Sequence, residues 1–211
     1  MHILYVCTGN ICRSPTAERL TRAYAEACLP DPSQLTTASA GTQAVVGSSM
    51  HPTAEMVLLG LGGQGSGFRA GLLEEWQVAE ADLVLTMSRK QRRTVLGGSP
   101  RALSRTFTLR EAHALMQGIP YAPLPDASDL TRRGQALVAA LARQRASRVS
   151  LDPRVDDIID PIGRDQQTFL RVGNDIATPL LDLLAVLCGT EEWDEEDDYR
   201  RMGVSPANAS G

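Results

Sequence analysis

The chain has 211 residues, of which 43% are hydrophobic and 22% are charged, enough to bury one core in a single domain with some elaboration. Its 21 Lys and Arg against 25 Asp and Glu give a net charge of -4, which excludes the overall basic surface typical of proteins that bind nucleic acid or anionic lipid. The sequence also lacks an apolar run of the ~20 residues needed to cross a bilayer and the pattern of a signal peptide, so we expect a cytoplasmic protein with no nucleic-acid or membrane partner.

The first part of the chain reads as a strand, a loop and a helix. Residues 2–6 form an apolar run typical of a buried parallel strand. After the loop, Ser14 is expected to cap a helix and Pro15 to stand in its first turn, and apolar residues recur at helical spacing as far as Ala27. The next expected elements are a strand over residues 35–40 and a helix over residues 52–59.

The alternation of strands and helices continues through the middle of the chain. We expect a strand over residues 81–87, a basic helix over residues 88–96, and a strand over residues 104–109 that leads into a further helix. Alternating strands and helices predict parallel crossovers, and therefore an α/β fold with a doubly wound four-stranded parallel sheet and helices on both faces. Ligands of such sheets bind at the carboxyl ends of the strands.

The pattern changes in the last third of the chain. Residues 121–155 are expected to be an insertion that carries an extra exposed helix, and the apolar stripe over residues 169–187 predicts a last helix that packs on the sheet, with a kink at Pro179. Residues 1–188 would then be a single domain. The segment 189–211 is strongly acidic and poor in apolar residues, which predicts disorder.

The loop in VCTGNICRSP, residues 6–15, joins the first strand to the first helix. Such a loop directs several backbone N–H groups at one point, where the helix dipole adds partial positive charge, so an oxyanion can bind there. Arg13 can add two parallel hydrogen bonds to a phosphate. Cys7 would face the phosphorus, in an environment of the kind that favours the thiolate.

The C-x5-R spacing by itself is a weak signal, but its context strengthens it. Gly9 and Asn10 tolerate the left-handed backbone angles of a tightly curled loop. CTGNICRSP, SAGT at residues 39–42, and Asp160 with the following proline resemble the low-molecular-weight protein tyrosine phosphatases. The resemblance covers most of residues 1–188, outside the 121–155 segment.

The resemblance implies the roles of the site residues. In that family the cysteine attacks phosphorus, the arginine holds the phosphoryl oxygens and the aspartate protonates the leaving group, which implies these roles for Cys7, Arg13 and Asp160. The residues implied to bind phosphate are Thr8, Gly9, Asn10, Ile11, Cys12, Arg13 and Ser14.

Three Asp-Pro pairs compete for the role of the acid. Asp31 lies in the first helix-to-strand connection, where a turn is expected. Asp160 immediately precedes the last helix, as the family's aspartate does, and Asp152 is the alternative. Where the family carries aromatic walls around a phosphotyrosine, this chain has Val45 and Ile162, which lose ring stacking worth ~0.5–1.5 kcal/mol per pair.

The same residues are also compatible with other functions. An arsenate reductase would need further cysteines, and residues 29–187 contain none. A phosphoprotein-binding module could keep the anion site without turnover. A zinc site at Cys7 and Cys12 would need a second pair of Cys or His ligands, and the sequence has none at suitable spacing. We therefore expect no metal and no cofactor. The leading hypothesis is a phosphomonoesterase, acting on a phosphorylated protein or a small aryl phosphate; the sequence leaves the oligomeric state open.

Cys12 suggests redox sensitivity. The four cysteines, which also include Cys28 and Cys188, are too few for a disulfide framework, so free thiols are expected. A loop that curls around an anion should bring Cys12 near Cys7, within the ~4.4–6.8 Å Cα separation of a disulfide. Cys12 could then trap an oxidised Cys7 as a reversible disulfide, or it could simply fill space behind the loop.

Overall fold

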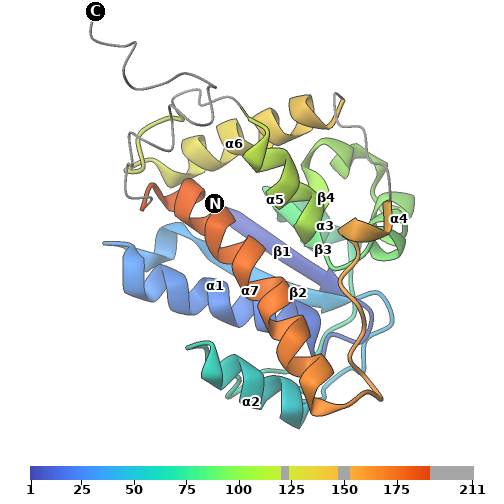
Figure 1. Cartoon of the computed structure of the whole chain (residues 1–211). Helices are drawn as coiled ribbons and strands as arrows, with labels where there is room; N and C mark the ends of the chain where they lie inside the picture. Colours follow the sequence, from blue (N-terminus) through green and yellow to red (C-terminus); the bar gives the residue numbers. More distant parts are fainter. Residues whose placement is uncertain (120–123, 147–152, 191–211) are drawn as a thin grey trace, which may run out of the picture.

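The computed structural model describes residues 1–119, 124–146 and 153–190. Four parallel strands form one sheet in the order β2-β1-β3-β4, and helices cover both of its faces (Figure 1). The expected doubly wound fold is confirmed. The strands are β1 (His2–Cys7), β2 (Thr36–Gly41), β3 (Leu83–Thr86) and β4 (Thr106–Thr108).

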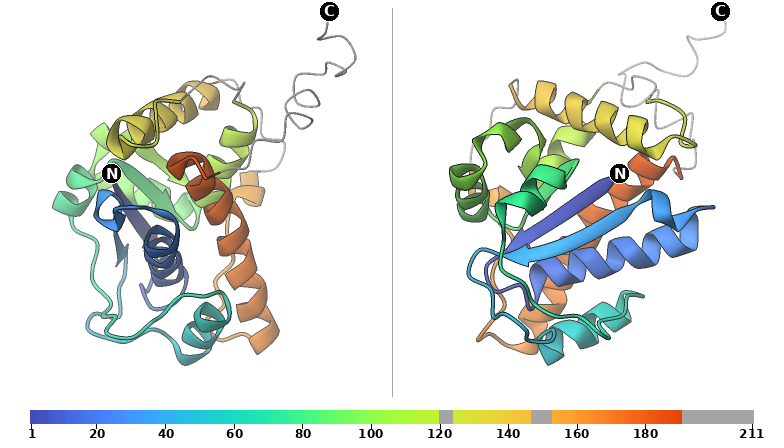
Figure 2. Two further views of the ribbon diagram at one scale, coloured as in Figure 1. Left: turned by 90° about the vertical axis from the view of Figure 1, so that its left-hand side faces the viewer. Right: turned by 180° about the vertical axis from the view of Figure 1, so that it is seen from behind.

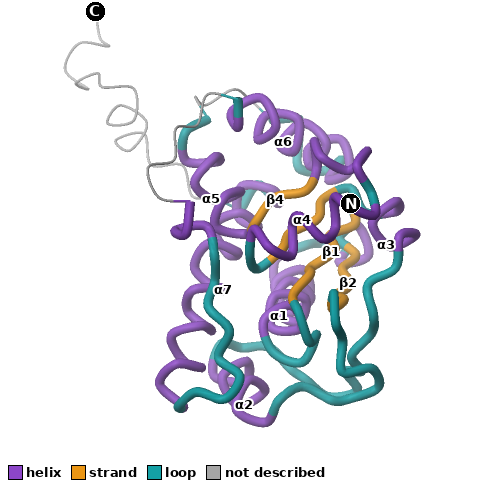
Figure 3. The backbone as a smooth tube through the Cα atoms, turned by 90° about the vertical axis from the view of Figure 1, so that its right-hand side faces the viewer, coloured by secondary structure: helices purple, strands orange, loops and turns teal. Residues whose placement is uncertain are grey.

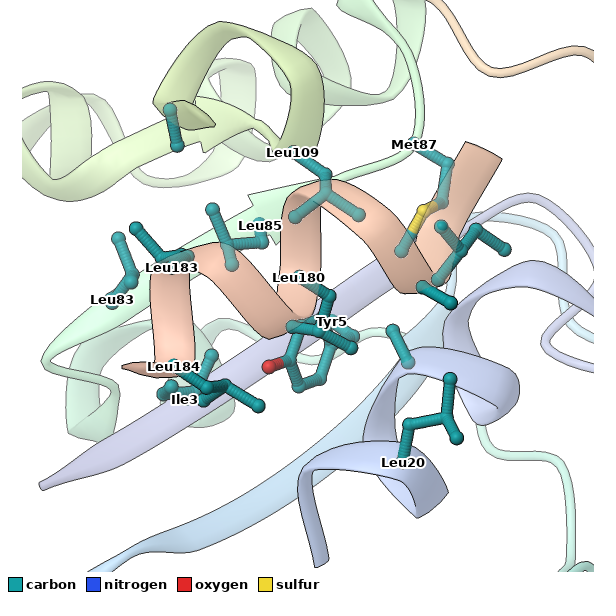
Figure 4. Packing of buried hydrophobic residues seen from close by; sticks show 14 of the residues in the cluster. Ile3, Tyr5, Leu20, Leu83, Leu85, Met87, Leu109, Leu180, Leu183 and Leu184 are labelled. Atoms are coloured by element: carbon teal, nitrogen blue, oxygen red, sulfur yellow. The ribbon is translucent and has the colours of Figure 1, made fainter. Parts of the chain in front are cut away.

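One face of the sheet carries the larger core. Ile3 and Tyr5 of β1 and Leu83 and Leu85 of β3 point to this face, because alternate residues of a strand share a side. The helix α7 runs across the face in front of β1, beside α1 (Figure 1), and its leucines pack against these strand residues (Figure 4). The helices contributing to this core include α1 (Arg13–Cys28), α2 (Pro52–Gly60), α5 (Leu109–Gln117) and α7 (Gln166–Cys188).

The opposite face carries a smaller core. Leu4, Val6 and Val84 pack there against Val78 and Val95 of two short helices. The view from behind shows the sheet in front of α1 and α7 (Figure 2). The helices on this side are α3 (Glu75–Glu80) and α4 (Arg89–Gly98). The 3-10 segments of the described residues are η1 (Pro32–Gln34), η2 (Pro100–Arg105) and η3 (Pro153–Asp156).

Helix α6 (Leu130–Arg145) covers the end of the sheet where the strands begin (Figure 3). A Cβ added at Gly134 would lie 2.6 Å from Met1 Sδ, so the helix passes close to the start of β1. Arg145 donates to Thr106 O at 2.6 Å, at the start of β4. We expected an exposed helix here, but its Leu137 and Leu141 are buried in the main core. Helix α6 therefore braces the sheet from the end opposite the Cys7 loop.

Several boundaries differ from the sequence-based expectations. Ser14 lies inside α1 and does not cap it; Cys12 holds the cap position without a side-chain hydrogen bond. Residues 104 and 105 belong to η2, because Pro100 starts a 3-10 turn that ends only where β4 begins. Helix α3 was missed. Helix α7 continues through Pro179, where a kink stays a prediction. The expected disorder of the acidic tail falls almost entirely on residues outside the described ranges.

Within the described part of the chain, no helix combines the length and the apolar character needed to cross a membrane.

Candidate active site

The loop after β1 is curled by hydrogen bonds from the segment that follows β2. The carbonyls of Cys7, Thr8 and Gly9 accept from the backbone N–H groups of residues 42, 43 and 45 at 2.9–3.0 Å. These bonds turn the carbonyls away from the centre of the loop. Asn10 has φ 54, the left-handed conformation that an asparagine tolerates better than most residues. The loop therefore has the shape expected from its glycine and asparagine.

Gly41, at the end of β2, permits the close approach between the two segments. A Cβ added there would lie 2.5 Å from the carbonyl oxygen of Thr8 and 3.0 Å from the backbone of Ala44. A larger residue would push the loop from its place. This contact explains why a glycine stands in the SAGT stretch.

Cys7 lies at the carboxyl end of β1 and is 2% exposed. Its sulfur accepts hydrogen bonds from Asn10 N at 3.3 Å and from the Ser14 hydroxyl at 2.9 Å. The Ser14 hydroxyl, expected to cap the helix, contacts the Cys7 sulfur instead.

Arg13 begins α1 and is 4% exposed. Its guanidinium donates to Ile158 O at 3.1 Å and forms an ion pair with the carboxylate of Asp160. Its Nε is buried and has no hydrogen-bond partner among the described residues. Buried guanidinium nitrogens are normally satisfied, so this atom is suited to an anion in the loop.

The segment around Asp160 is tied to the end of β3. Ile158 N donates to Met87 O at 2.8 Å, and Arg89 holds Asp157 by a backbone bond at 2.7 Å and a side-chain bond at 3.0 Å. Although partial burial disfavours the charge of Asp157, these bonds and the charge of Arg89 hold its pKa below the usual range. The Arg89–Asp157 pair was not predicted. It anchors the segment that carries Asp160.

Asp160 itself is placed at the mouth of the loop. Its side chain is 46% exposed, and its Oδ1 accepts from Ile162 N at 3.2 Å. The competing Asp152 lies outside the described residues, and Asp31 caps the 3-10 turn η1, as its expected turn position implied. Of the two described aspartates that precede a proline, Asp160 is the one that contacts Arg13.

Two aliphatic side chains stand at the rim of the loop. Val45 is 49% exposed and its N–H is bonded to Gly9 O, while Ile162 is 45% exposed and follows Asp160. Their role as substrate walls stays a prediction. Two further exposed apolar residues, which the sequence did not single out, are Val46, next to Val45, and Ile159, next to Asp160.

Cys12 is also buried, on the helix side of the loop. Burial, reinforced by the nearby Cys7, raises its pKa to about 12 against the opposing charge of Arg13. Cys12 is thus a neutral thiol at ordinary pH. Both cysteines are free thiols in the structure.

Two sets of contacts could not be read from local patterns. Gln91 of α4 is 4% exposed and donates to the Thr8 hydroxyl at 3.1 Å. The buried Glu18 of α1 accepts from Ser39 of β2 at 2.6 Å. Among the described residues, no three His, Cys, Asp or Glu side chains gather as a metal site requires.

Comparison with known proteins gives consistent matches. Residues 2–117 match the family described as low molecular weight phosphotyrosine protein phosphatase. The low molecular weight protein-tyrosine-phosphatase Ptp of Acinetobacter johnsonii is 36% identical over 108 residues, which are 51% of this chain and 71% of that protein. The protein-arginine-phosphatase of Bacillus subtilis (strain 168) is 30% identical over 158 residues, which are 73% of this chain and 100% of that protein.

A solved structure agrees with these matches. The low molecular weight protein tyrosine phosphatase from T. tengcongensis superimposes with a TM-score of 0.62 at 25% sequence identity, covering 87% of this chain and 97% of that one.

Proposed function

Because the chain belongs to the low molecular weight phosphotyrosine protein phosphatase family, we propose that it hydrolyses phosphate monoesters through a phosphocysteine formed on Cys7. The observation that carries this proposal is the convergence of the Cys7 loop, the Arg13 guanidinium and the Asp160 carboxylate at one end of the sheet. These groups supply a nucleophile, a phosphate-binding cation and a proton donor. The proposed substrates are phosphorylated proteins or small aryl phosphates, and the proposed reaction uses no cofactor.

The phosphoryl group would bind inside the loop formed by residues 7–14. Its oxygens would accept from the loop amides and from Arg13, whose buried Nε has no other partner among the described residues. A phosphate dianion competes with Asp160 for the guanidinium. Substrate binding would therefore release Asp160 from Arg13 to serve as the proton donor.

The reaction would proceed in two displacements. The Cys7 thiolate attacks phosphorus, the bond to the leaving oxygen breaks, and that oxygen takes a proton from Asp160. Water then attacks the phosphocysteine, gives its proton to Asp160, and expels the thiolate as inorganic phosphate forms. Arg13 neutralises the transferring group in both steps.

Asp160→Asn tests the assignment of the acid. We expect hydrolysis of phenyl phosphate to slow by ~10²–10⁴-fold, because the leaving phenolate no longer receives a proton. The loss should shrink for para-nitrophenyl phosphate, whose leaving group needs no proton. Steady-state kinetics on both esters measures this difference.

Asp152→Asn is the matched control, since the same substitution then falls at another Asp-Pro pair. Near-normal rates are expected for it. If Asp152→Asn shows this dependence on the leaving group and Asp160→Asn does not, the assignment of Asp160 as the acid is wrong.

The substrate class is tested by comparing three substrates. We expect release of phosphate from para-nitrophenyl phosphate and from a phosphotyrosine peptide, with little preference for the peptide, because Val45 and Ile162 offer no aromatic stacking. Phosphoarginine peptides are the third substrate. The Bacillus subtilis relative named as a protein-arginine-phosphatase, matched along its whole length, makes this the second candidate. Turnover of phosphoarginine alone would replace the tyrosine assignment, and turnover of none would overturn the proposed function.

An arsenate reductase remains less well supported. Arsenate would fit the same loop, but the reaction needs further thiols near the nucleophile. Cys28 and Cys188 lie at the ends of α1 and α7, and these helix ends are far from the loop, which lies at the start of α1. Cys12 is the one other cysteine in the loop.

Cys12 is proposed to protect Cys7 from irreversible oxidation. After peroxide and then dithiothreitol, wild type should recover most of its activity through a Cys7–Cys12 disulfide, because a sulfenic acid at Cys7 is trapped by the neighbouring thiol. Cys12→Ser should recover several-fold less, since its Cys7 proceeds to higher acids. Equal recovery in both proteins, with no Cys7–Cys12 linkage by mass spectrometry, would leave Cys12 as packing.

A cytoplasmic location is proposed because catalysis needs Cys7 reduced, and reducing compartments keep thiols free. We also propose that residues 1–188 form one domain with an inserted 121–155 segment, since α6 packs into the same core as the sheet. No nucleic-acid or membrane partner is proposed.

A further inference from the structure

The turn after Asp160 brings the chain back toward that residue. Gly163 has φ 77, a left-handed backbone angle that a glycine adopts without strain. The turn is closed by Arg164 N, which donates to Pro161 O at 3.0 Å, and Ile162 within it is 45% exposed. Arg164 therefore stands beside Asp160 in space, although it follows four residues later in the chain.

The side chain of Arg164 is held at the mouth of the Cys7 loop. Its Nε donates to the backbone oxygen of Asp160 at 3.1 Å, while the residue as a whole is exposed to solvent. The carboxylate of Asp160 contacts Arg13, which ends the loop. The guanidinium of Arg164 is thus fixed at Nε by the segment that carries the proposed acid, and its two terminal nitrogens bind no described residue.

The carboxylates beside Arg164 are engaged by other groups. Asp160 is paired with Arg13, and Asp165 accepts from the backbone N–H of Thr168 at 2.9 Å and from its hydroxyl at 2.6 Å. These bonds from Thr168, helped by the charge of Arg164, lower the pKa of Asp165. Arg164 itself forms no ion pair with any residue in the described part of the chain.

The start of α4 adds further positive charge near the mouth. Gln91 donates to the loop and Arg89 is paired with Asp157, so the first turn of this helix lies against the site. Lys90 and Arg93 of the same helix are exposed, and the charge of Arg93 contributes to the low pKa of Asp157. Because the whole chain has a net charge of -4, this positive rim does not follow from overall composition.

We propose that Arg164 binds an acidic residue that flanks the phosphorylated residue, so that the enzyme prefers phosphopeptides with acidic flanks. The inference rests on the proposed function, because it takes the Cys7 loop as the phosphoryl site. A phosphorylated side chain that reaches into the loop leaves the neighbouring residues of its peptide at the mouth, where Arg164 is held. A guanidinium can give a carboxylate two parallel hydrogen bonds.

The test compares two phosphotyrosine peptides that differ only in charge. One carries two aspartates on each side of the phosphotyrosine, and the other carries asparagines at the same positions. The measured quantity is the ratio of kcat/KM for the acidic peptide to that for the neutral one, in which any general change of rate cancels. We expect a ratio of about five in wild type at low salt, as for one exposed ion pair, falling below about two in Arg164→Gln and at high salt.

Further variants distinguish recognition of charge from a structural role of the turn. Arg164→Glu should bring the ratio below one, because it repels the acidic peptide, whereas Arg164→Lys keeps the charge and should keep a ratio above that of Arg164→Gln. Arg132→Gln removes an exposed arginine of α6, at the opposite end of the sheet, and should keep the wild-type ratio. A ratio near one in wild type, an unchanged ratio in Arg164→Gln, or an equal fall in Arg132→Gln overturns the proposal.

Binding without turnover lets the two proposals fail separately. Fluorescence anisotropy of the same two peptides, labelled and mixed with Cys7→Ser, measures the preference without chemistry. Tighter binding of the acidic peptide that is lost when Arg164→Gln is added, together with no turnover of any substrate by wild type, would overturn the proposed function and support the role of Arg164. Equal turnover and equal binding of both peptides would do the reverse.

Discussion

Cys7→Ser is expected to abolish release of phosphate from para-nitrophenyl phosphate, with a loss of at least about 10⁴-fold in kcat, comparable to the removal of nucleophiles in other enzymes. Serine keeps the size of the side chain and its hydrogen bonds from Asn10 and Ser14. A hydroxyl, however, stays protonated where a thiol can ionise. Steady-state kinetics with matched thermal melts separates loss of chemistry from loss of folding.

Cys28→Ser is the control for this change. Cys28 is exposed at the end of α1, far from the loop, so its activity should equal that of wild type. Substantial phosphate release by Cys7→Ser would contradict the covalent mechanism.

Arg13→Ala is expected to reduce kcat/KM by ~10³–10⁵-fold, the range seen when an arginine that stabilises a transferring phosphoryl group is removed. The alanine also leaves the Ile158 carbonyl and the Asp160 carboxylate without the donor that holds them. Arg13→Lys keeps the charge but loses the planar fork that matches a phosphate, so its loss should also be large but smaller.

Arg171→Ala removes an arginine of α7 that is 73% exposed and should leave activity unchanged. Activity of Arg13→Ala within tenfold of wild type, in a folded protein, would show that Arg13 does not hold the phosphoryl group.

The sequence identified best those site residues that lie close together in the chain. Cys7, Asn10 and Arg13 stand within one short loop, so their types and spacing identify an anion site directly. Asp160 lies 147 residues after Arg13 and contacts it; only its resemblance to the acid of a known family pointed to it. The Arg89–Asp157 pair has no local signature, because it joins a helix start to a distant loop.

The sequence likewise predicted only part of the fold. The sequence pattern located the four strands of the described residues to within a few residues at their ends, yet it missed α3, whose six residues are too few to show a helical pattern. The sequence also predicted a helix within residues 121–155, but as an exposed helix, without showing that one side of it is buried. That side packs at the starts of the strands, a contact between parts far apart in the chain.

The most direct test of the covalent mechanism is to mix the protein with para-nitrophenyl phosphate, quench with acid within the first turnovers, and map the phosphoryl group by mass spectrometry. The proposed mechanism predicts a phosphoryl group on Cys7 of wild type, absent from Cys7→Ser. Continued hydrolysis with no phosphorylated Cys7, or with the phosphoryl group on another residue, would contradict it.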